Sequence, residues 1–358
     1  MRRAIWWTVG VVLVLGALGT VILRMPSVED ALIRRVAARL VTATGDALFE
    51  PDALRVLLCG TSAPLPHETR AKACTAVFAA GRLWVVDTGP GAWNRIALSR
   101  IDGRRIGAVL FTHFHSDHIG DLGEFNLQTW AAGRPEALRV FGPPGVERVV
   151  AGFAEAYALD TRYRILHHGA DFLPEAAARM QAMPVTIPGG AVSLPILEHE
   201  GLRISAFPVD HRPIVPAYGY RFDYRGRSVV VSGDTAKTPS LVAAAEGADV
   251  LVHEAQANHL IAIVGEAASA AGRDRVAKIM ADIPSYHTTP VEAAEQANAA
   301  HVRLLVLSHL NPPPPNRFAE RPFVRGVAEV RPTGWILGDD GLLIELPADS
   351  DKVTTRHW

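Results

Sequence analysis

Four metal-ligand side chains within six positions, directly after an apolar segment, constrain the fold of this chain more than any other feature. The segment AVLFT predicts a buried strand, and HFHSDH follows it at once. Side chains alternate along an extended chain, so His113, His115 and Asp117 share one side, and the following turn brings His118 round. Neutral imidazole and carboxylate are metal ligands. One ion cannot comfortably take all four, so the pattern predicts two metal ions.

Three later residues repeat the pattern of a ligand-type side chain placed just after an apolar run. His211 follows SAFPVD, Asp234 follows VVVSG, and His309 follows LLVLS. In open α/β sheets, ligands gather at the edge formed by the carboxyl ends of the strands. Asp87, after LWVV, fits the same edge, and we expect it to support a ligand rather than bind the metal itself.

Short apolar runs alternate with helical patterns from Leu54 onward, which predicts a layered α/β architecture. The expected strands are 54–59, 76–78, 83–86, 108–112, 138–141, 202–209, 218–223, 228–232, 250–253, 304–307 and 335–337. The expected helices between them are 121–132, 145–157, 239–246, 274–283 and 290–300. Several strands are apolar on both faces, so we expect them to be covered on both sides.

With these motifs in order, residues 54–345 resemble the metallo-β-lactamase superfamily. The resemblance implies a four-layer αβ/βα sandwich with a dimetal site at the edges of two sheets. One metal would be held by His113, His115 and His211, the other by Asp117, His118 and His309, with Asp234 bridging them. The expected cofactors are two Zn²⁺ ions, with Mn²⁺ or Fe²⁺ as alternatives.

Two further motifs resemble those of ribonuclease Z within the superfamily. VHEA contains Glu254, and HTTP begins at His287. In that family the glutamate and the histidine form a proton-donating pair, so we count Glu254 and His287, with Asp117, as the candidate catalytic residues.

One departure from ribonuclease Z concerns the long arm that grips transfer RNA in that family. Between His211 and Asp234 the chain has room only for a hairpin, with Arg225-Gly226 as its turn. The arylsulfatases of the metallo-β-lactamase type have the same core without an arm.

These motifs predict a dinuclear zinc hydrolase that cleaves a phosphodiester or sulfate ester with a metal-bridging hydroxide. A ribonuclease Z-like endonuclease, a lactone or β-lactam hydrolase, and a non-catalytic metal-binding membrane module are the alternatives. The net charge is −1 and no dense basic cluster occurs, so we expect a small-molecule or ester substrate rather than nucleic acid. The sequence is also compatible with a homodimer.

The N-terminal segment reads as a membrane anchor rather than as part of the fold. Residues 5–23 carry no charge and are just long enough to span a bilayer, although a cleaved signal segment is the rival interpretation. We expect an anchor or signal at 1–25, a connecting helix at 26–50, the hydrolase domain at 51–348 and a flexible tail at 349–358. The expected location is the inner membrane, with the domain on the extracytoplasmic side.

The chain has two cysteines, Cys59 and Cys74. Both lie in apolar surroundings, so we interpret them as buried thiols; a disulfide would fit an exported domain.

Overall fold

The computed structural model describes residues 2–42 and 44–358, which form two compact units, 1–45 and 46–358. The first unit contains the helices α1 (Arg2–Leu23) and α2 (Pro26–Thr42). Helix α2 confirms the helix expected in the connecting segment.

No helix in the described part of the chain is both long and apolar enough to cross a membrane. The structure therefore does not support the anchor expected at residues 1–25. A span needs about 20 consecutive apolar residues. The side chains of residues 1–5, 9–12 and 14, on which that expectation also drew, lie outside the described residues.

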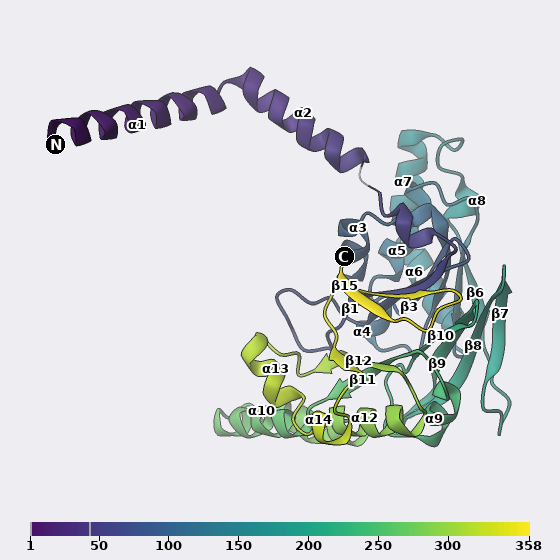
Figure 1. Cartoon of the computed structure of the whole chain (residues 1–358). Helices are drawn as coiled ribbons and strands as arrows, with labels where there is room; N and C mark the ends of the chain where they lie inside the picture. Colours follow the sequence, from purple (N-terminus) through teal and green to yellow (C-terminus); the bar gives the residue numbers. More distant parts are fainter. Residues whose placement is uncertain (1, 43) are drawn as a thin grey trace. The chain divides into compact units, whose positions relative to one another are not determined.

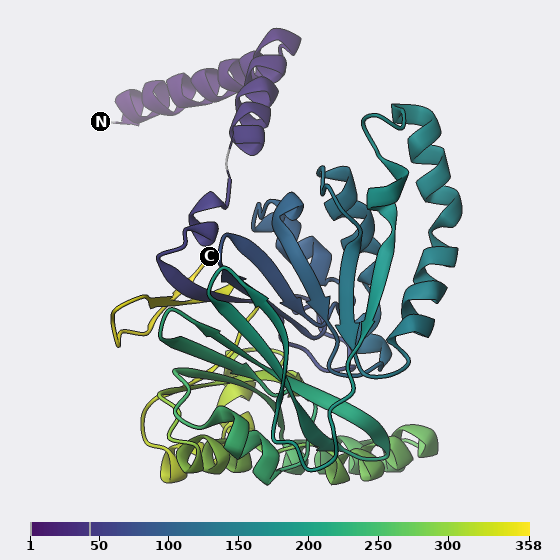
Figure 2. The ribbon, with the colours of Figure 1, turned by 90° about the vertical axis from the view of Figure 1, so that its right-hand side faces the viewer.

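The second unit contains two twisted sheets that face each other (Figures 1 and 2). The first sheet has the strand order β15-β14-β1-β2-β3-β4-β5-β6, and the second β13-β12-β11-β10-β9-β8-β7. The strands of the first sheet are β1 (Ala53–Gly60), β2 (Cys74–Ala79), β3 (Arg82–Val86), β4 (Ile106–Leu110), β5 (Leu138–Gly142), β6 (Met180–Pro184), β14 (Leu342–Pro347) and β15 (Thr354–His357). Those of the second are β7 (Leu194–His199), β8 (Leu202–His211), β9 (Ile214–Tyr224), β10 (Arg227–Val231), β11 (Val250–Gln256), β12 (Leu304–Asn311) and β13 (Trp335–Leu337).

Helices cover the outer face of each sheet. Over the first sheet and its rim lie α3 (Ala92–Leu98), α4 (Ser116–Ile119), α5 (Leu122–Ala131), α6 (Val146–Ala156), α7 (Ala158–His168) and α8 (Glu175–Ala178), with the 3₁₀ turns η1 (Asp46–Phe49) and η2 (Gly103–Arg105). Beside the second lie α9 (Pro239–Ala245), α10 (Asn258–Ala270), α11 (Asp274–Asp282), η3 (Ile283–Ser285), α12 (Pro290–Ala299), α13 (Arg317–Phe323) and α14 (Val327–Val330). The order helix, sheet, sheet, helix is the expected four-layer sandwich.

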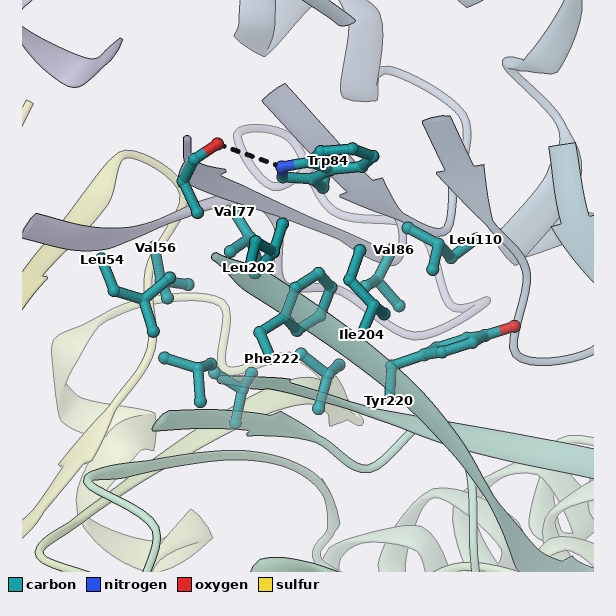
Figure 3. Packing of buried hydrophobic residues seen from close by; sticks show 14 of the residues in the cluster. Leu54, Val56, Val77, Trp84, Val86, Leu110, Leu202, Ile204, Tyr220 and Phe222 are labelled. Atoms are coloured by element: carbon teal, nitrogen blue, oxygen red, sulfur yellow. Dashed lines mark hydrogen bonds between the residues drawn. The ribbon is translucent and has the colours of Figure 1, made fainter. Parts of the chain in front are cut away.

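The central core lies between the two sheets (Figure 3). Trp84 from β3 is fully buried there, and its indole nitrogen donates to the carbonyl of Ala79 at 3.2 Å. Ile204 and Phe222 reach the same space from the second sheet. Strands with apolar residues on both faces therefore pack against the opposite sheet on one side and against helices on the other.

Four strands escaped the sequence analysis: β6, β7 and β15 are edge strands, and β14 lies next to β15. β6 and β7 are edge strands with prolines and partly exposed side chains, so neither shows an apolar run. β15, with the sequence TTRH, is exposed throughout. The tail expected to be flexible from residue 349 is thus partly ordered: β15 pairs antiparallel with β14, and the indole of Trp358 donates to the carbonyl of Ser99 at 3.0 Å.

Cys59 and Cys74 form a disulfide between the neighbouring strands β1 and β2. The interpretation of two free thiols is therefore wrong. Strand register explains the pairing, because Cys74 lies opposite the irregular pairing at Leu58–Gly60 that contains Cys59, with 5.0 Å between the Cα atoms.

We predict that removing this crosslink destabilises the domain without changing its fold. The disulfide closes a 15-residue separation, for which loop entropy gives about 3 kcal/mol. The double variant Cys59→Ala/Cys74→Ala should lower the free energy of unfolding in urea by about 2–4 kcal/mol. Titration of the denatured, non-reduced wild-type protein should detect no free thiol; two titratable thiols would contradict the pairing.

Candidate metal centre

The seven predicted ligands meet at one edge of the two sheets. The turn after β4 carries His113 and His115 and leads into α4, which holds Asp117 and His118. β8 ends at His211, Asp234 follows β10, and His309 lies near the end of β12. A glycine makes this close meeting feasible: at Gly89 a Cβ atom would lie 2.1 Å from the carbonyl oxygen of Asp117.

The first group of candidate ligands consists of His113, His115, His211 and Asp234. One ligand atom from each lies within 4.8 Å of the others. Nε2 of His113 and Nδ1 of His115 are 2.9 Å apart. His113, His211 and Asp234 are buried, whereas His115 is exposed, so one side of this group is open to solvent.

The second group consists of Asp117, His118 and His309, which satisfy the same distance criterion and are all buried. Asp234 lies against this group as well, with its oxygens 3.4 Å from His118 Nε2 and 3.4 Å from His309 Nδ1. Its carboxylate is therefore shared between the two groups, as a bridging ligand would be.

Several buried polar atoms at the centre have no hydrogen-bond partner in the described chain. They include His118 Nε2, His211 Nε2, Asp234 Oδ1 and His309 Nδ1. Leaving a buried polar group unsatisfied costs free energy. All four atoms belong to candidate ligands, so the donor set fits a bound cation.

The charge balance also favours cations. Asp87, Asp117 and Asp234 are all buried around His118. Burial opposes protonation of His118, but the charges of these carboxylates, Asp234 first, raise its pKa well above the usual value. An excess of buried negative charge is costly unless it is neutralised, and metal ions would do so.

Hydrogen bonds orient two of the imidazoles. Nδ1 of His118 lies 2.8 Å from Asp87 Oδ2, and Nδ1 of His211 lies 3.1 Å from the carbonyl oxygen of Tyr286. With the proton on Nδ1, each ring turns the Nε2 lone pair toward the centre. Burial lowers the pKa of His211 to about 4, so that ring is neutral at pH 7.

Asp87 is itself held in place by the metal-binding segment. Its two oxygens accept hydrogen bonds from the backbone nitrogen of Thr112 at 2.9 Å and from the Thr112 hydroxyl at 2.8 Å. The sequence analysis named Asp87 but not Thr112 or Tyr286. Their only sequence signal is that each directly precedes a functional histidine.

His309 reaches the centre through a backbone irregularity. The pairing of β11 with β12 shifts at this point, from Glu254–Ser308 to Ala255–Leu310, so that His309 has no partner. Its φ of 46° is uncommon for a residue other than glycine. The bulge redirects the side chain, as bulges near functional sites commonly do.

Glu254 and His287 form a buried pair beside the two ligand groups. Nδ1 of His287 lies 2.9 Å from Glu254 Oε1, which also accepts the backbone N–H of Thr235 at 2.8 Å. Burial opposes the charge on His287, but Glu254 raises its pKa to about 9. A ring nitrogen of His287 lies within 4.8 Å of ligand atoms of Asp234 and His309. The pair can therefore deliver a proton to a group bound at the centre.

Three other histidines do not belong to the two ligand groups. His167 and His168 end α7 and are exposed. His199 packs against Trp84, with 5.7 Å between ring centroids.

Comparisons with known proteins agree with this fold and site. The family model described as the β-lactamase superfamily domain matches residues 82–310. Ribonuclease Z of Mycolicibacterium paratuberculosis is 34% identical over 262 residues, which cover 72% of this chain and 86% of the relative. Ribonuclease Z of Mycobacterium sp. strain KMS is 35% identical over 262 residues, which cover 73% of this chain and 85% of the relative.

Two solved structures share the fold at lower identity. The short form of human tRNase Z has a TM-score of 0.58 and 20% identity, covering 82% of this chain and 99% of its own. The metallo-β-lactamase fold protein YhfI from Bacillus subtilis has a TM-score of 0.57 and 18% identity. The match covers 82% of this chain and 100% of the YhfI chain.

Fold and site together define a metal-dependent hydrolase that acts on ester bonds. The chain belongs to the metallo-β-lactamase superfamily, in its ribonuclease Z-like branch.

We predict that Asp87→Asn weakens metal binding without unfolding the protein, because an amide in place of the carboxylate no longer stabilises the Nδ1–H form of His118 to the same degree. The loss of metal affinity should be about 10–100-fold, measured by competition with a chromophoric chelator. Asp121→Asn is a matched control, since Asp121 accepts the backbone N–H of Trp93 at the start of α3 instead of touching a ligand. Equal losses in both variants would show a general fold effect.

Proposed function

We propose that this protein is a dinuclear zinc phosphodiesterase that cleaves RNA or short ribonucleotide chains. The observation that carries the proposal is the Glu254–His287 pair, which adjoins a centre with two ligand groups sharing Asp234. The names of the ribonuclease Z relatives support a phosphodiester in RNA over a sulfate ester. They also argue against the sequence-based expectation that nucleic acid is an unlikely substrate.

In this proposal His113, His115 and His211 would hold one ion and Asp117, His118 and His309 the other, with Asp234 available to both groups. A pair of divalent ions supplies Lewis-acid polarisation of the phosphoryl oxygens and activates water at neutral pH. Histidine and carboxylate donors suit zinc.

The protein residues that complete the reaction are His287 and Glu254. A water molecule gives up a proton to the solvent and its oxygen forms the new bond to phosphorus, while the bond from phosphorus to the leaving oxygen breaks. His287 transfers its proton to the leaving oxygen, and Glu254 holds the ring through Nδ1. The buried Glu254 carboxylate offsets the positive charge of His287 before the transfer, and Asp234 adds to this effect.

The short connections between β8, β9 and β10 favour short RNA over a folded transfer RNA as the substrate. β8 and β9 pair directly, with residues 212–213 as their turn, and β9 joins β10 through Arg225 and Gly226. Arg225 and Gly226 both have positive φ, as a two-residue hairpin turn requires. This region has no arm that could clamp a large RNA at a distance from the scissile bond.

The location of the domain is a separate part of the proposal. A disulfide persists in oxidising compartments and is rare in the cytosol of most organisms. The Cys59–Cys74 bond therefore supports a domain that works outside the cytosol. Fusion of a reporter enzyme that folds only after export would test this, and a reporter that stays inactive would contradict it.

The first test of the proposed reaction is a substrate panel with zinc-loaded protein. We expect turnover of bis-(p-nitrophenyl) phosphate and of short single-stranded RNA, little accurate trimming of precursor transfer RNA, and no turnover of p-nitrophenyl sulfate. Chelation should abolish activity, and zinc should restore it. Faster cleavage of the sulfate than of any phosphodiester would overturn the proposal.

The second test concerns the proton donor. General acid catalysis typically contributes about 10²–10⁴-fold, and its benefit grows as the leaving group becomes poorer. His287→Ala should slow cleavage of RNA, which has an alkoxide leaving group, by that factor, and should slow release of p-nitrophenolate far less. Glu254→Gln should act in the same direction more weakly, with zinc content unchanged in both variants. Equal losses on the two substrates would remove the proton-donor role.

A further inference from the structure

Tyr286 lies beside the proton donor and is not part of either ligand group. Its ring centroid is 4.8 Å from that of His287, with 47° between the planes, and 5.3 Å from that of His211, with 80° between the planes. The side chain is half-buried. One residue therefore touches both a candidate metal ligand and the acid, and still presents part of its ring to solvent.

The position of this ring relative to the reaction follows from the hydrogen bond of His287. Glu254 occupies Nδ1, so the proton reaches the leaving group from Nε2. A leaving oxygen must then lie about 2.6–3.2 Å from Nε2. The group attached to that oxygen would extend away from phosphorus past the His287 ring, and the Tyr286 ring is a direct neighbour of that ring.

The segment that delivers Tyr286 is a helical hairpin inserted between the two members of the acid pair. α10 and α11 follow Glu254 in the chain, and η3 leads from α11 to Tyr286. The two helices pack closely, since a Cβ atom at Gly265 would lie 3.2 Å from Met280 Cβ. Tyr286 itself lies in the short connection between η3 and α12, directly after this packed pair of helices.

We propose that Tyr286 is a specificity-determining residue, whose ring stacks on the base of the nucleoside that leaves with the alcohol product. This inference rests on the proposed function and adds the leaving-group side of the substrate to it. An aromatic face accepts any base, because stacking needs a flat π surface rather than a hydrogen-bond pattern. The carbonyl of Tyr286 already orients His211, so the side chain can be changed while that backbone contact remains.

The test compares two substrates that differ only in the leaving group. One is a dinucleoside monophosphate, whose leaving alcohol carries a base, and the other is the corresponding nucleoside methyl phosphate, whose leaving alcohol is methanol. Both need a proton from His287. Tyr286→Ala should raise KM for the dinucleotide about 10-fold and leave kcat and zinc content nearly unchanged. KM for the methyl ester should hardly move, and Tyr286→Phe should behave as wild type on both.

Tyr163→Ala is the matched control, because Tyr163 is an exposed tyrosine on α7. It should alter neither substrate. If Tyr286→Ala damages both substrates equally, or lowers kcat or zinc content, then the ring positions His211 and His287 and the stacking role is wrong. If the wild-type protein cleaves bis-(p-nitrophenyl) phosphate but shows no preference for the dinucleotide, only this inference fails. If it cleaves no phosphodiester, the proposed function fails and the inference fails with it.

Discussion

The structure around the site depends on one buried carboxylate. Asp234 is only 3% exposed, and its oxygens lie 3.4 Å from nitrogens of both His118 and His309. A buried carboxylate is costly unless positive charge or hydrogen bonds compensate it. Burial acts to raise the pKa of Asp234, but the surrounding histidines, His309 first, hold it well below the usual value. The ionised carboxylate can then bind cations, and through them tie both sheets together at their shared edge.

The proton-transfer pair depends on the same arrangement. Glu254 lies on β11 next to β12, the strand that carries His309, so the acid pair and the ligand set are built on neighbouring strands. His287 arrives from a separate segment, after the α10–α11 hairpin. Because β11 and β12 are paired and packed under α12, Glu254 is fixed relative to His309, and its hydrogen bond to His287 positions the candidate proton donor.

Two histidines of the candidate site lie in different environments. Burial outweighs the charge of Asp234 at His211 and lowers the pKa of that ring to about 4, so a lone pair is free to bind a metal. His287 is buried against Glu254, which raises its pKa to about 9 and keeps a proton ready for transfer. The residue type is identical, and the two rings differ in the partner of Nδ1, which is the backbone carbonyl of Tyr286 for His211 and the carboxylate of Glu254 for His287.

The sequence alone predicted the candidate ligands and the layered fold, because both depend on local patterns. His113, His115, Asp117 and His118 follow one apolar run within a few residues, and strands with two apolar faces require cover on both sides. Most strands were also predictable, since each is a short apolar segment bounded by turn residues. The polar strand β15 was not, because its order comes from pairing with β14 rather than from its own residues.

Only the tertiary structure decided how the separate segments meet. The bulge at His309, the carbonyl of Tyr286 on His211 and the Cys59–Cys74 bond all depend on register or on contacts between distant parts of the chain. A sequence pattern reports the period of side chains along one element. It holds no information on which residue of a neighbouring element lies opposite. A shift of one residue in strand register leaves the sequence of the strand unchanged but moves every side chain to the other face of the sheet.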